Sequence, residues 1–201
     1  MPSGRRQVSG GDSPAREADP SPERLLRDAG AMLDGHFQLA SGRHSSVYVE
    51  KFRLLEQPVQ TEALCGMIAE WAQPLAPQLV AGPTTGGIII SYEVARLLGV
   101  RGIFAESANG RREFERGFTI APGERVLVVD DVLTTGGSVR DVLEAVRALG
   151  GEVAGVAVLI DRTGGTAEFG VPFFACLTLD LESYDPESCP LCAKSAPLTI
   201  T

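Results

Sequence analysis

Short apolar runs alternate with longer amphipathic segments along most of this 201-residue chain. The clearest run covers residues 125–129, where four successive apolar residues follow an arginine. Residues 79–81, 102–105, 153–160 and 173–179 are runs of the same kind. Continuous apolar runs, unlike alternating ones, are typical of strands that are buried on both faces of a parallel sheet.

Helical periodicity separates these runs. It predicts helices over residues 61–76, 88–98 and 138–149, and Gly150-Gly151 ends the last of them. Strands that alternate with helices in this way indicate an α/β protein with a doubly wound, mostly parallel sheet flanked by helices. Ligands of such folds bind at the carboxyl ends of the strands, so we expect the functional residues there.

The first 20 residues are rich in Ser, Gly, Pro, Arg and acidic residues and have almost no large apolar side chain. Such a segment buries too little surface to offset its ordering entropy, which predicts a disordered tail over residues 1–20. A single domain is expected over residues 21–201. Ser21 and Pro22 are a suitable cap and first residue for a helix that extends to about residue 33.

Composition excludes several classes of function. The net charge of −8 argues against broad nucleic-acid binding, which depends on many cations that neutralise phosphates. No apolar run reaches 18 residues and the N-terminus has no signal-like apolar stretch, so we expect no membrane association and a cytoplasmic location. Sixteen of the 18 basic side chains are arginines, and the only lysines are Lys51 and Lys194, too few for roles that demand a lysine.

The cysteines and histidines give weak signals. Cys65 and Cys176 lie in apolar patterns and are expected to be small buried hydrophobic residues. A structural zinc site needs four ligands, whereas the CxxC at residues 189–192 supplies two, so a structural turn without metal is predicted there. His36 and His44 are expected in loops or at the surface.

Residues 126–138 carry the strongest chemical signal. Their sequence is Val-Leu-Val-Val-Asp-Asp-Val-Leu-Thr-Thr-Gly-Gly-Ser. It predicts a buried strand with Asp130 and Asp131 at its exit, then a glycine loop that enters a helix. The glycines allow close approach of a ligand, and the loop N–H groups with the positive end of the helix make an anion site. A phosphate there, beside two carboxylates, suits a sugar phosphate.

Two other nucleotide sites are excluded by their motifs. The chain contains no GxxxxGK[ST], so a P-loop is not predicted. It also has no GxGxxG that opens a helix after a strand, so a dinucleotide site is not predicted.

The 126–138 segment resembles the signature with which type I phosphoribosyltransferases bind 5-phosphoribosyl-1-pyrophosphate (PRPP). The resemblance implies the fold of that family, with a small N-terminal hood over the sheet. It also implies that the two aspartates hold the ribose hydroxyls and that residues 134–138 wrap the 5-phosphate. The implied PRPP-binding residues are Asp130, Asp131, Val132, Leu133, Thr134, Thr135, Gly136, Gly137 and Ser138.

Three more segments resemble the orotate phosphoribosyltransferases, and the similarity covers roughly residues 25–195. They are the F-x-L-x-S-G-x-x-S-x-x-Tyr pattern at 37–48, the glycine-rich loop at 82–87 and Asp161-Arg162. The resemblance implies that Thr134 and Arg162 bind orotate. By themselves, Asp161 and Arg162 are also compatible with an ordinary exposed ion pair.

The chain departs from this family in its cations. Ala40 stands where family members often have a lysine, and Thr84 and Thr85 occupy the pyrophosphate loop where another lysine is common. The loop at 106–118 is short and has no lysine or histidine. Its arginines can hold pyrophosphate oxygens, but they do not readily give up a proton. Arg112 of this loop is predicted to be catalytic, and Arg111 and Arg116 of the same loop are predicted to bind pyrophosphate. The other predicted catalytic residues are Asp130 and Asp131.

The resemblance implies transfer of the phosphoribosyl group of PRPP to orotate, giving orotidine 5′-monophosphate and pyrophosphate, in pyrimidine (UMP) biosynthesis. It further implies Mg²⁺ carried by the pyrophosphate of PRPP, and a homodimer in which the arginine loop reaches the neighbouring active site. Two alternatives stay open. One is a purine or uracil phosphoribosyltransferase, and the other is a PRPP-sensing regulator that has lost catalysis.

Overall fold

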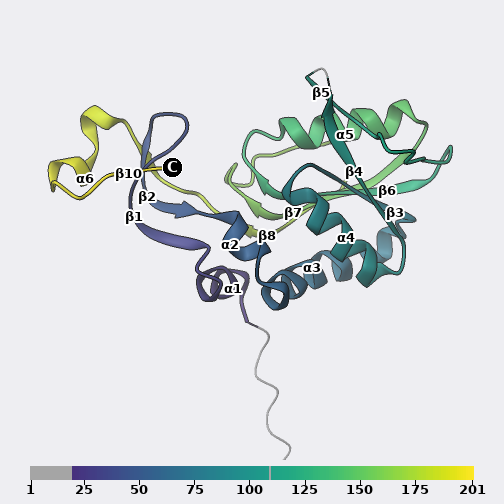
Figure 1. Ribbon diagram of the computed structural model, residues 1–201, viewed down its shortest axis with the longest axis horizontal. Coiled ribbons are helices and arrows are strands. Elements are labelled where there is room, and N and C mark those ends of the chain that lie inside the picture. The colour runs from purple at the N-terminus through teal and green to yellow at the C-terminus, as the bar shows by residue number, and fades with distance from the viewer. Residues whose placement is uncertain (1–19, 109) are drawn as a thin grey trace, which may run out of the picture.

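The computed structural model describes residues 20–108 and 110–201 (Figure 1). Its larger sheet has the strand order β5-β4-β3-β6-β7-β8. The strands are β3 (Leu79–Pro83), β4 (Arg101–Ala108), β5 (Arg111–Glu113), β6 (Arg125–Leu133), β7 (Glu152–Asp161) and β8 (Phe173–Thr178). All neighbours pair in parallel except β5, which is antiparallel to β4. The predicted α/β class with a mostly parallel sheet is confirmed.

Helices cover both faces of this sheet (Figure 1). Helices α3 (Pro58–Ala72) and α4 (Gly86–Leu98) lie on one face, and α5 (Gly137–Ala148) lies on the other. The 3₁₀ turn η1 (Gln73–Leu75) follows α3. These helices occupy the segments that periodicity predicts, with shifted ends. Helix α3 begins before residue 61, because Pro58 suits the first turn of a helix.

Strand β6 lies at the centre of the core. Val126 and Val128 pack in the cluster on the α5 face, whereas Leu127 and Val129 pack in the cluster on the α3–α4 face. Successive side chains of a strand point to opposite faces, so a strand covered on both sides needs an unbroken apolar run. This arrangement explains why residues 126–129 are all apolar.

The two aspartates are part of this strand. The sequence predicts them at the exit of a strand that ends at residue 129, but pairing with β7 continues through Asp130↔Val158 to Leu133↔Asp161. The same alternation places Asp130 on the α5 side and Asp131 on the α4 side. The predicted strand end is therefore wrong. Because the two aspartates are successive strand residues, their carboxylates point to different parts of the site.

The two ends of the described chain build a second, smaller sheet, which we call the hood (Figure 1, left). Its order is β10-β1-β2-β9. The hood strands are β1 (Met32–Gln38), β2 (His44–Val49), β9 (Ser183–Tyr184) and β10 (Thr199–Ile200). Between β9 and β10 lie the 3₁₀ turn η2 (Pro186–Ser188) and the short helix α6 (Pro190–Ala193). The C-terminal segment therefore flanks the β1–β2 hairpin on both edges.

Helix α1 (Pro22–Asp28) precedes the hood, and α2 (Lys51–Leu55) follows its hairpin. Ser21 caps α1 as predicted, since its Oγ accepts a hydrogen bond from Arg24 N at 3.3 Å. The predicted extension to about residue 33 is wrong. Gly30 adopts φ +64°, which interrupts the helix, and β1 begins at Met32.

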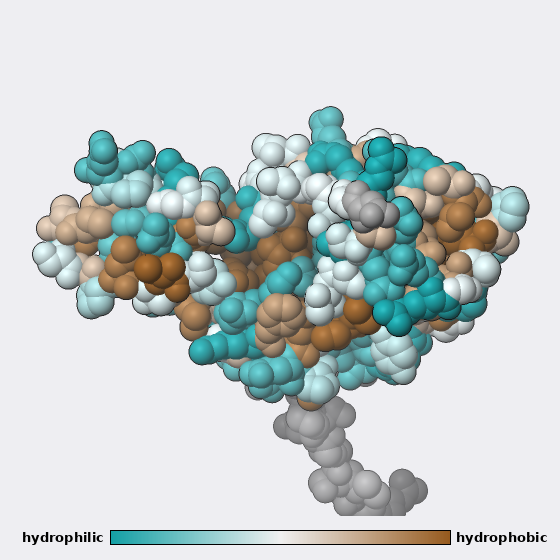
Figure 2. Space-filling model, turned by 45° about the horizontal axis from the view of Figure 1, so that its top comes forward, coloured by the Kyte–Doolittle hydropathy of each residue, from teal (hydrophilic) through white to brown (hydrophobic). Residues whose placement is uncertain are grey.

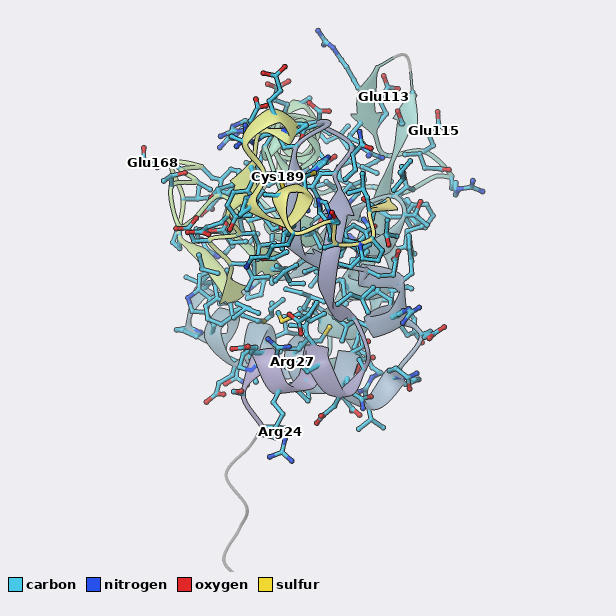
Figure 3. All side chains as sticks on the ribbon, turned by 90° about the vertical axis from the view of Figure 1, so that its left-hand side faces the viewer. Arg24, Arg27, Glu113, Glu115, Glu168 and Cys189 are labelled. Carbon is cyan, nitrogen blue, oxygen red and sulfur yellow. The ribbon has the colours of Figure 1, made fainter. Side chains whose placement is uncertain are left out.

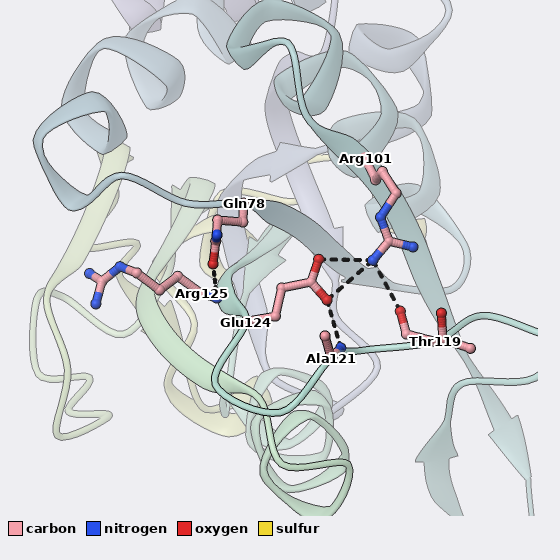
Figure 4. Close-up of polar contacts among 6 residues, drawn as sticks. All are labelled: Gln78, Arg101, Thr119, Ala121, Glu124 and Arg125. Carbon is pink, nitrogen blue, oxygen red and sulfur yellow. Dashed lines mark hydrogen bonds and ion pairs between the residues drawn. The ribbon is translucent and has the colours of Figure 1, made fainter.

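Polar contacts close the amino-terminal edge of the large sheet (Figure 4). The Arg101 guanidinium donates to both carboxylate oxygens of Glu124, at 2.8 and 3.2 Å, and the N–H of Ala121 donates to Glu124 Oε2 at 2.8 Å. Arg125 N donates to Gln78 Oε1 at 3.0 Å. The polar groups at this edge therefore pair with one another, and a ligand site is expected at the carboxyl edge of the sheet.

Two predictions concern the ends and the location of the chain. The tail predicted over residues 1–20 lies, except for residue 20, outside the described residues. Among the helices described, none is both long and apolar enough to cross a membrane.

Candidate active site

A cleft of ≈ 460 Å³ lies where the carboxyl ends of β3, β6 and β7 meet the end of β2. Figure 2 shows the surface hollowed between the hood and the larger sheet. The lining residues come from separate parts of the chain: Tyr48, Val49, Glu50, Lys51, Phe52, Pro83, Thr84, Thr85, Gly86, Arg112, Asp130, Asp131, Val132, Thr134, Ser138 and Arg162. The position agrees with the rule that open α/β sheets bind ligands at the carboxyl ends of their strands.

The acid pair is buried at the bottom of this cleft. Asp130 is 8% exposed and Asp131 is 3% exposed. The N–H of Asp131 donates to Asp130 Oδ1 at 2.8 Å. Burial, followed by repulsion from the Asp131 carboxylate, raises the pKa of Asp130 to about 7. Negative charge on both carboxylates at once is therefore unfavourable in this site, and a nearby cation or hydroxyl donor lowers that cost.

The ammonium group of Lys51 contacts one member of this pair, Asp131. Its Nζ lies 2.8 Å from Asp131 Oδ2 and 3.1 Å from Oδ1. Oδ2 has almost no exposed surface, because it is buried against Gly86 and faces the Lys51 ammonium. Lys51 is not among the residues that the sequence predicts for the site. The available signal is its position at the start of α2, soon after the motif that ends at Tyr48.

Residues 134–138 surround a small pocket of ≈ 50 Å³ beside Asp130. Gly136 caps α5 with φ +78°, a conformation that favours glycine. The first backbone N–H groups of α5 have no hydrogen-bond acceptor within the helix. They lie at the end of α5 that borders this pocket, where they can donate to an anion. Arg140 Nη1 donates to Thr135 O at 2.7 Å, which holds the loop in place. The structure thus brings the predicted phosphate-binding residues around one pocket.

The glycine-rich loop at 82–87 packs directly against the acid pair. A Cβ on Gly86 would lie 1.7 Å from Asp131 Oδ2, and a Cβ on Gly82 would lie 2.4 Å from Gly87 O. Any larger residue at these positions displaces either the carboxylate or the loop backbone. Glycine is therefore required here by close approach.

Arg112 reaches the same loop from the β4–β5 hairpin. Its Nη1 donates to Thr84 Oγ1 at 2.6 Å, and its side chain lines the cleft of its own chain. Arg111 and Arg116 are not among the residues that line this cleft. Arg116 instead donates to Glu106 at 2.6 and 2.9 Å. Of the three arginines predicted in this segment, the structure brings one to the acid pair's cleft.

Arg162 lines the opposite part of the cleft. Its N–H donates to Leu133 O at 2.8 Å, which fixes it beside the end of β6. Asp161 is fully buried and accepts from Thr163 N and Oγ1, both at 2.7 Å, and from Gly165 N at 3.1 Å. The alternative of an exposed ion pair is therefore wrong, because Asp161 shapes the loop that presents Arg162.

A second polar cluster lies in the hood. His36 and His44 are each 4% exposed and lie on β1 and β2, so the prediction of loop or surface histidines is wrong. Both face Cys189 and Cys192. The sequence does not predict this cluster, because its histidines and its CxxC lie near opposite ends of the chain.

The parallel sheet, the acid pair on β6 and the glycine loop beside it define a phosphoribosyltransferase, and residues 62–183 match the family model of the phosphoribosyl transferase domain. Two relatives named orotate phosphoribosyltransferase, from Desulforamulus reducens and Pelotomaculum thermopropionicum, are 52% and 53% identical over 173 residues. The matches cover 86% of this chain and 91% of each relative. The chain belongs to the orotate phosphoribosyltransferase family.

Solved structures agree with this placement. The orotate phosphoribosyltransferase of Aeropyrum pernix is 33% identical, with a TM-score of 0.62 over 78% of this chain and 93% of that one. The Mycobacterium tuberculosis enzyme of the same name is 27% identical, with a TM-score of 0.66 over 80% of this chain and 97% of that one. An adenine phosphoribosyltransferase from Thermoanaerobacter pseudethanolicus, at 19% identity and a TM-score of 0.59 over 66% of this chain and 88% of that one, shares the fold alone.

Proposed function

We propose that this protein transfers the 5-phosphoribosyl group of PRPP to orotate, releasing orotidine 5′-monophosphate and pyrophosphate, as a step of pyrimidine (UMP) biosynthesis. One observation carries the proposal. A buried acid pair, a phosphate-sized loop and an arginine converge on one cleft in a chain that is about half identical to orotate phosphoribosyltransferases. Each group matches one part of the two substrates.

The ribose and its phosphate fit the β6–α5 region. The carboxylates of Asp130 and Asp131, which both line the cleft, accept hydrogen bonds from the ribose hydroxyls. Residues 134–138 bind the 5-phosphate through backbone N–H groups and hydroxyls at the positive end of α5. Because both carboxylates are buried, hydroxyl donors are worth more to them than they are in water.

The orotate base fits the side of the cleft that Arg162 lines. A guanidinium pairs with a carboxylate through two parallel hydrogen bonds, and orotate differs from uracil in carrying that carboxylate. Thr134 contacts the base from the start of the phosphate loop. Arg162 thus accounts for a preference for orotate over the uncharged bases.

The pyrophosphate fits the side formed by the 82–87 loop. Lys51 and Arg112 supply positive charge there, and Thr84 and Thr85 supply hydroxyls. Arg111 and Arg116 remain predicted contacts of the same group. The site also fits Mg²⁺ carried by PRPP. This ion prefers oxygen ligands, and it usually binds through substrate phosphates, one or two carboxylates and several waters. When bound, Mg²⁺ neutralises charge on the diphosphate.

The reaction breaks the bond from the anomeric carbon to the pyrophosphate oxygen and forms a bond from that carbon to a ring nitrogen of orotate. That nitrogen gives up its N–H proton to the departing pyrophosphate. The bonding electrons leave with pyrophosphate, so positive charge develops on the ribose, as in glycosyl transfers generally. The protein supplies no nucleophile. Its residues align the two substrates and neutralise the departing pyrophosphate through Arg112 and Lys51.

Two further elements belong to this proposal. The protein acts as a homodimer in the cytoplasm, as the family resemblance implies. Arg112 lies in the cleft of its own chain, which favours a catalytic role within one subunit. Contacts with the active site of the other subunit would then come from the rest of the β4–β5 hairpin. Lys51 and Arg112 also weaken the argument for a non-catalytic PRPP sensor, which rests on missing cations.

The test is a base panel. Purified protein is mixed with PRPP and Mg²⁺, and orotate, uracil, adenine, hypoxanthine or xanthine is added in separate wells while pyrophosphate release is followed. Release with orotate alone supports the proposal, and the Asp131→Asn variant should then lose most turnover while keeping its fold. Release with another base refutes the substrate. Silence in every well with PRPP still bound favours the sensor.

A further inference from the structure

Four potential metal ligands from the two ends of the chain meet inside the hood. His36 comes from β1 and His44 from β2, whereas Cys189 is the N-cap residue of α6 and Cys192 lies within that helix. Figure 3 shows Cys189 on the C-terminal segment beside the hairpin, above Arg24 and Arg27 in this view. The cluster is separate from the cleft, because none of its members lines that cleft.

The donor atoms are spaced as ligands of one small ion. The four atoms all lie within 4.8 Å of one another. Cys192 Sγ is 3.4 Å from His44 Nδ1 and 3.7 Å from His36 Nε2, and Cys189 Sγ is 3.6 Å from His36 Nε2. Tetrahedral Zn–N and Zn–S bonds of about 2.0 and 2.3 Å place neighbouring ligand atoms roughly 3.3–3.8 Å apart. The nitrogens of the two histidines, at 3.0 Å, are slightly closer than that.

A neighbouring carbonyl group orients one of the imidazoles. His36 Nδ1 lies 3.0 Å from Ala196 O, and a carbonyl only accepts, so Nδ1 carries the proton. The Nε2 lone pair of His36 is then directed at the cluster. Metal-bound histidines almost always donate their second ring N–H to a carbonyl, carboxylate or water in this way. The Ala196 carbonyl, which follows α6, therefore performs the orienting role expected around a metal.

Burial and charge also favour a metal. His36, His44 and Cys189 are each less than 5% exposed, and all four cysteines of the described residues are free thiols. Two thiolates neutralise the charge of a divalent ion, so the filled site carries no net charge into the interior. Soft sulfur with imidazole nitrogen in a tetrahedral set selects zinc over the hard cations.

We propose that His36, His44, Cys189 and Cys192 bind one structural Zn²⁺. Four protein ligands close the coordination sphere, so the ion has no open position for substrate. Its effect is to fasten the C-terminal segment to the hairpin, since the strands β9 and β10 are only two residues long. Small units with little core of their own are commonly stabilised by a metal or by disulfides. The hairpin in turn leads to Tyr48 and Lys51 in the cleft.

The first measurement is the metal content of untagged protein purified in reducing buffer without chelator. We expect about one zinc per chain, and cobalt substitution should give the visible absorption of a tetrahedral thiolate site. The Cys189→Ser/Cys192→Ser double variant should lose the metal. The matched control is Cys176→Ser, which removes a half-buried thiol outside the cluster and should retain the metal.

Single variants and zinc titration keep the test independent of folding failure. Cys192 is exposed, so the Cys192→Ser variant should fold. Its zinc affinity should fall by more than about 100-fold, because loss of a group that only orients a ligand already costs about 10–100-fold. Chelation of wild-type protein should lower its unfolding temperature and raise amide exchange in residues 183–201, and added zinc should reverse both. Three results would overturn the proposal: no zinc uptake by fully reduced protein, zinc retained by the double variant, or a Cys189–Cys192 disulfide in protein saturated with zinc.

Discussion

Replacing Lys51 with methionine removes the ammonium group that contacts the acid pair and keeps an unbranched side chain of similar length. In the structure, Nζ lies 2.8 and 3.1 Å from the two oxygens of Asp131, whose side chain is 4% exposed. Lys51 also lowers the pKa of Asp130, against the larger effect of burial. The substitution therefore leaves two adjacent buried carboxylates without this cation, and it removes positive charge from the pyrophosphate side of the cleft.

The two consequences differ in size. The Lys51 side chain is 37% exposed, so solvent screening reduces the ion pair to the scale of a surface pair, about 1 kcal/mol of folding stability. For a domain of this size that corresponds to a fall of roughly 2–4 °C in Tm. In the substrate complex water is excluded, and loss of one group that stabilises developing negative charge costs about 3–4 kcal/mol, or roughly 10²–10³ in kcat. We thus expect a large loss of turnover with a small loss of stability.

The assay compares Lys51→Met with Lys194→Met, which removes the other lysine at an exposed position. Steady-state rates of orotate consumption give kcat and the KM for each substrate, and thermal unfolding gives the change in Tm. The pH profile of Lys51→Met should also move to higher pH, because losing the ammonium raises the pKa of Asp130 further.

A kcat of Lys51→Met within about threefold of wild type, which is less than 1 kcal/mol of barrier, would contradict this role of Lys51. An equal loss of turnover in Lys194→Met would contradict it as well. A fall of Tm far beyond the expected range would instead show that Lys51 mainly supports the fold.

Three further predictions concern the same cleft. Arg162→Ala should raise the KM for orotate far more than that for PRPP, and equal effects in steady-state kinetics would remove Arg162 from the base site. Gly86→Ala should cut kcat by about 10²-fold, because the new Cβ would lie 1.7 Å from Asp131 Oδ2 and displace that carboxylate. Its control Gly66→Ala has no atom within 4 Å of the new Cβ and should stabilise helix α3 by about 0.5–1 kcal/mol in denaturant unfolding. Burial raises the pKa of Asp130 to about 7 in the folded protein, above about 3.9 when unfolded. The stability this shift contributes is fully present below the unfolded pKa and is lost as pH rises through the folded pKa. The free protein should therefore lose roughly 1 kcal/mol between about pH 6 and pH 8, and Asp130→Asn should abolish that loss in urea unfolding.

Local patterns along the chain are sufficient to predict the fold class and the family. Residues 126–129 are apolar at every position because β6 is covered on both faces, and that requirement is visible locally. Residues 126–138 hold the acid pair and the phosphate loop on one strand–turn–helix unit, so their relative placement follows from chain connectivity. Local patterns also predicted α3, α4 and α5, with errors confined to their ends.

Only the tertiary structure revealed the contacts that join distant segments. Lys51 and Asp131 are 80 residues apart and meet because the hood hairpin ends above the carboxyl edge of β6. His36 is 153 residues from Cys189, so the CxxC showed two ligands where the fold assembles four. Local periodicity reports which face of an element is buried, but not which distant side chain it faces. Strand order and the return of the C-terminus to the hood determined those partners.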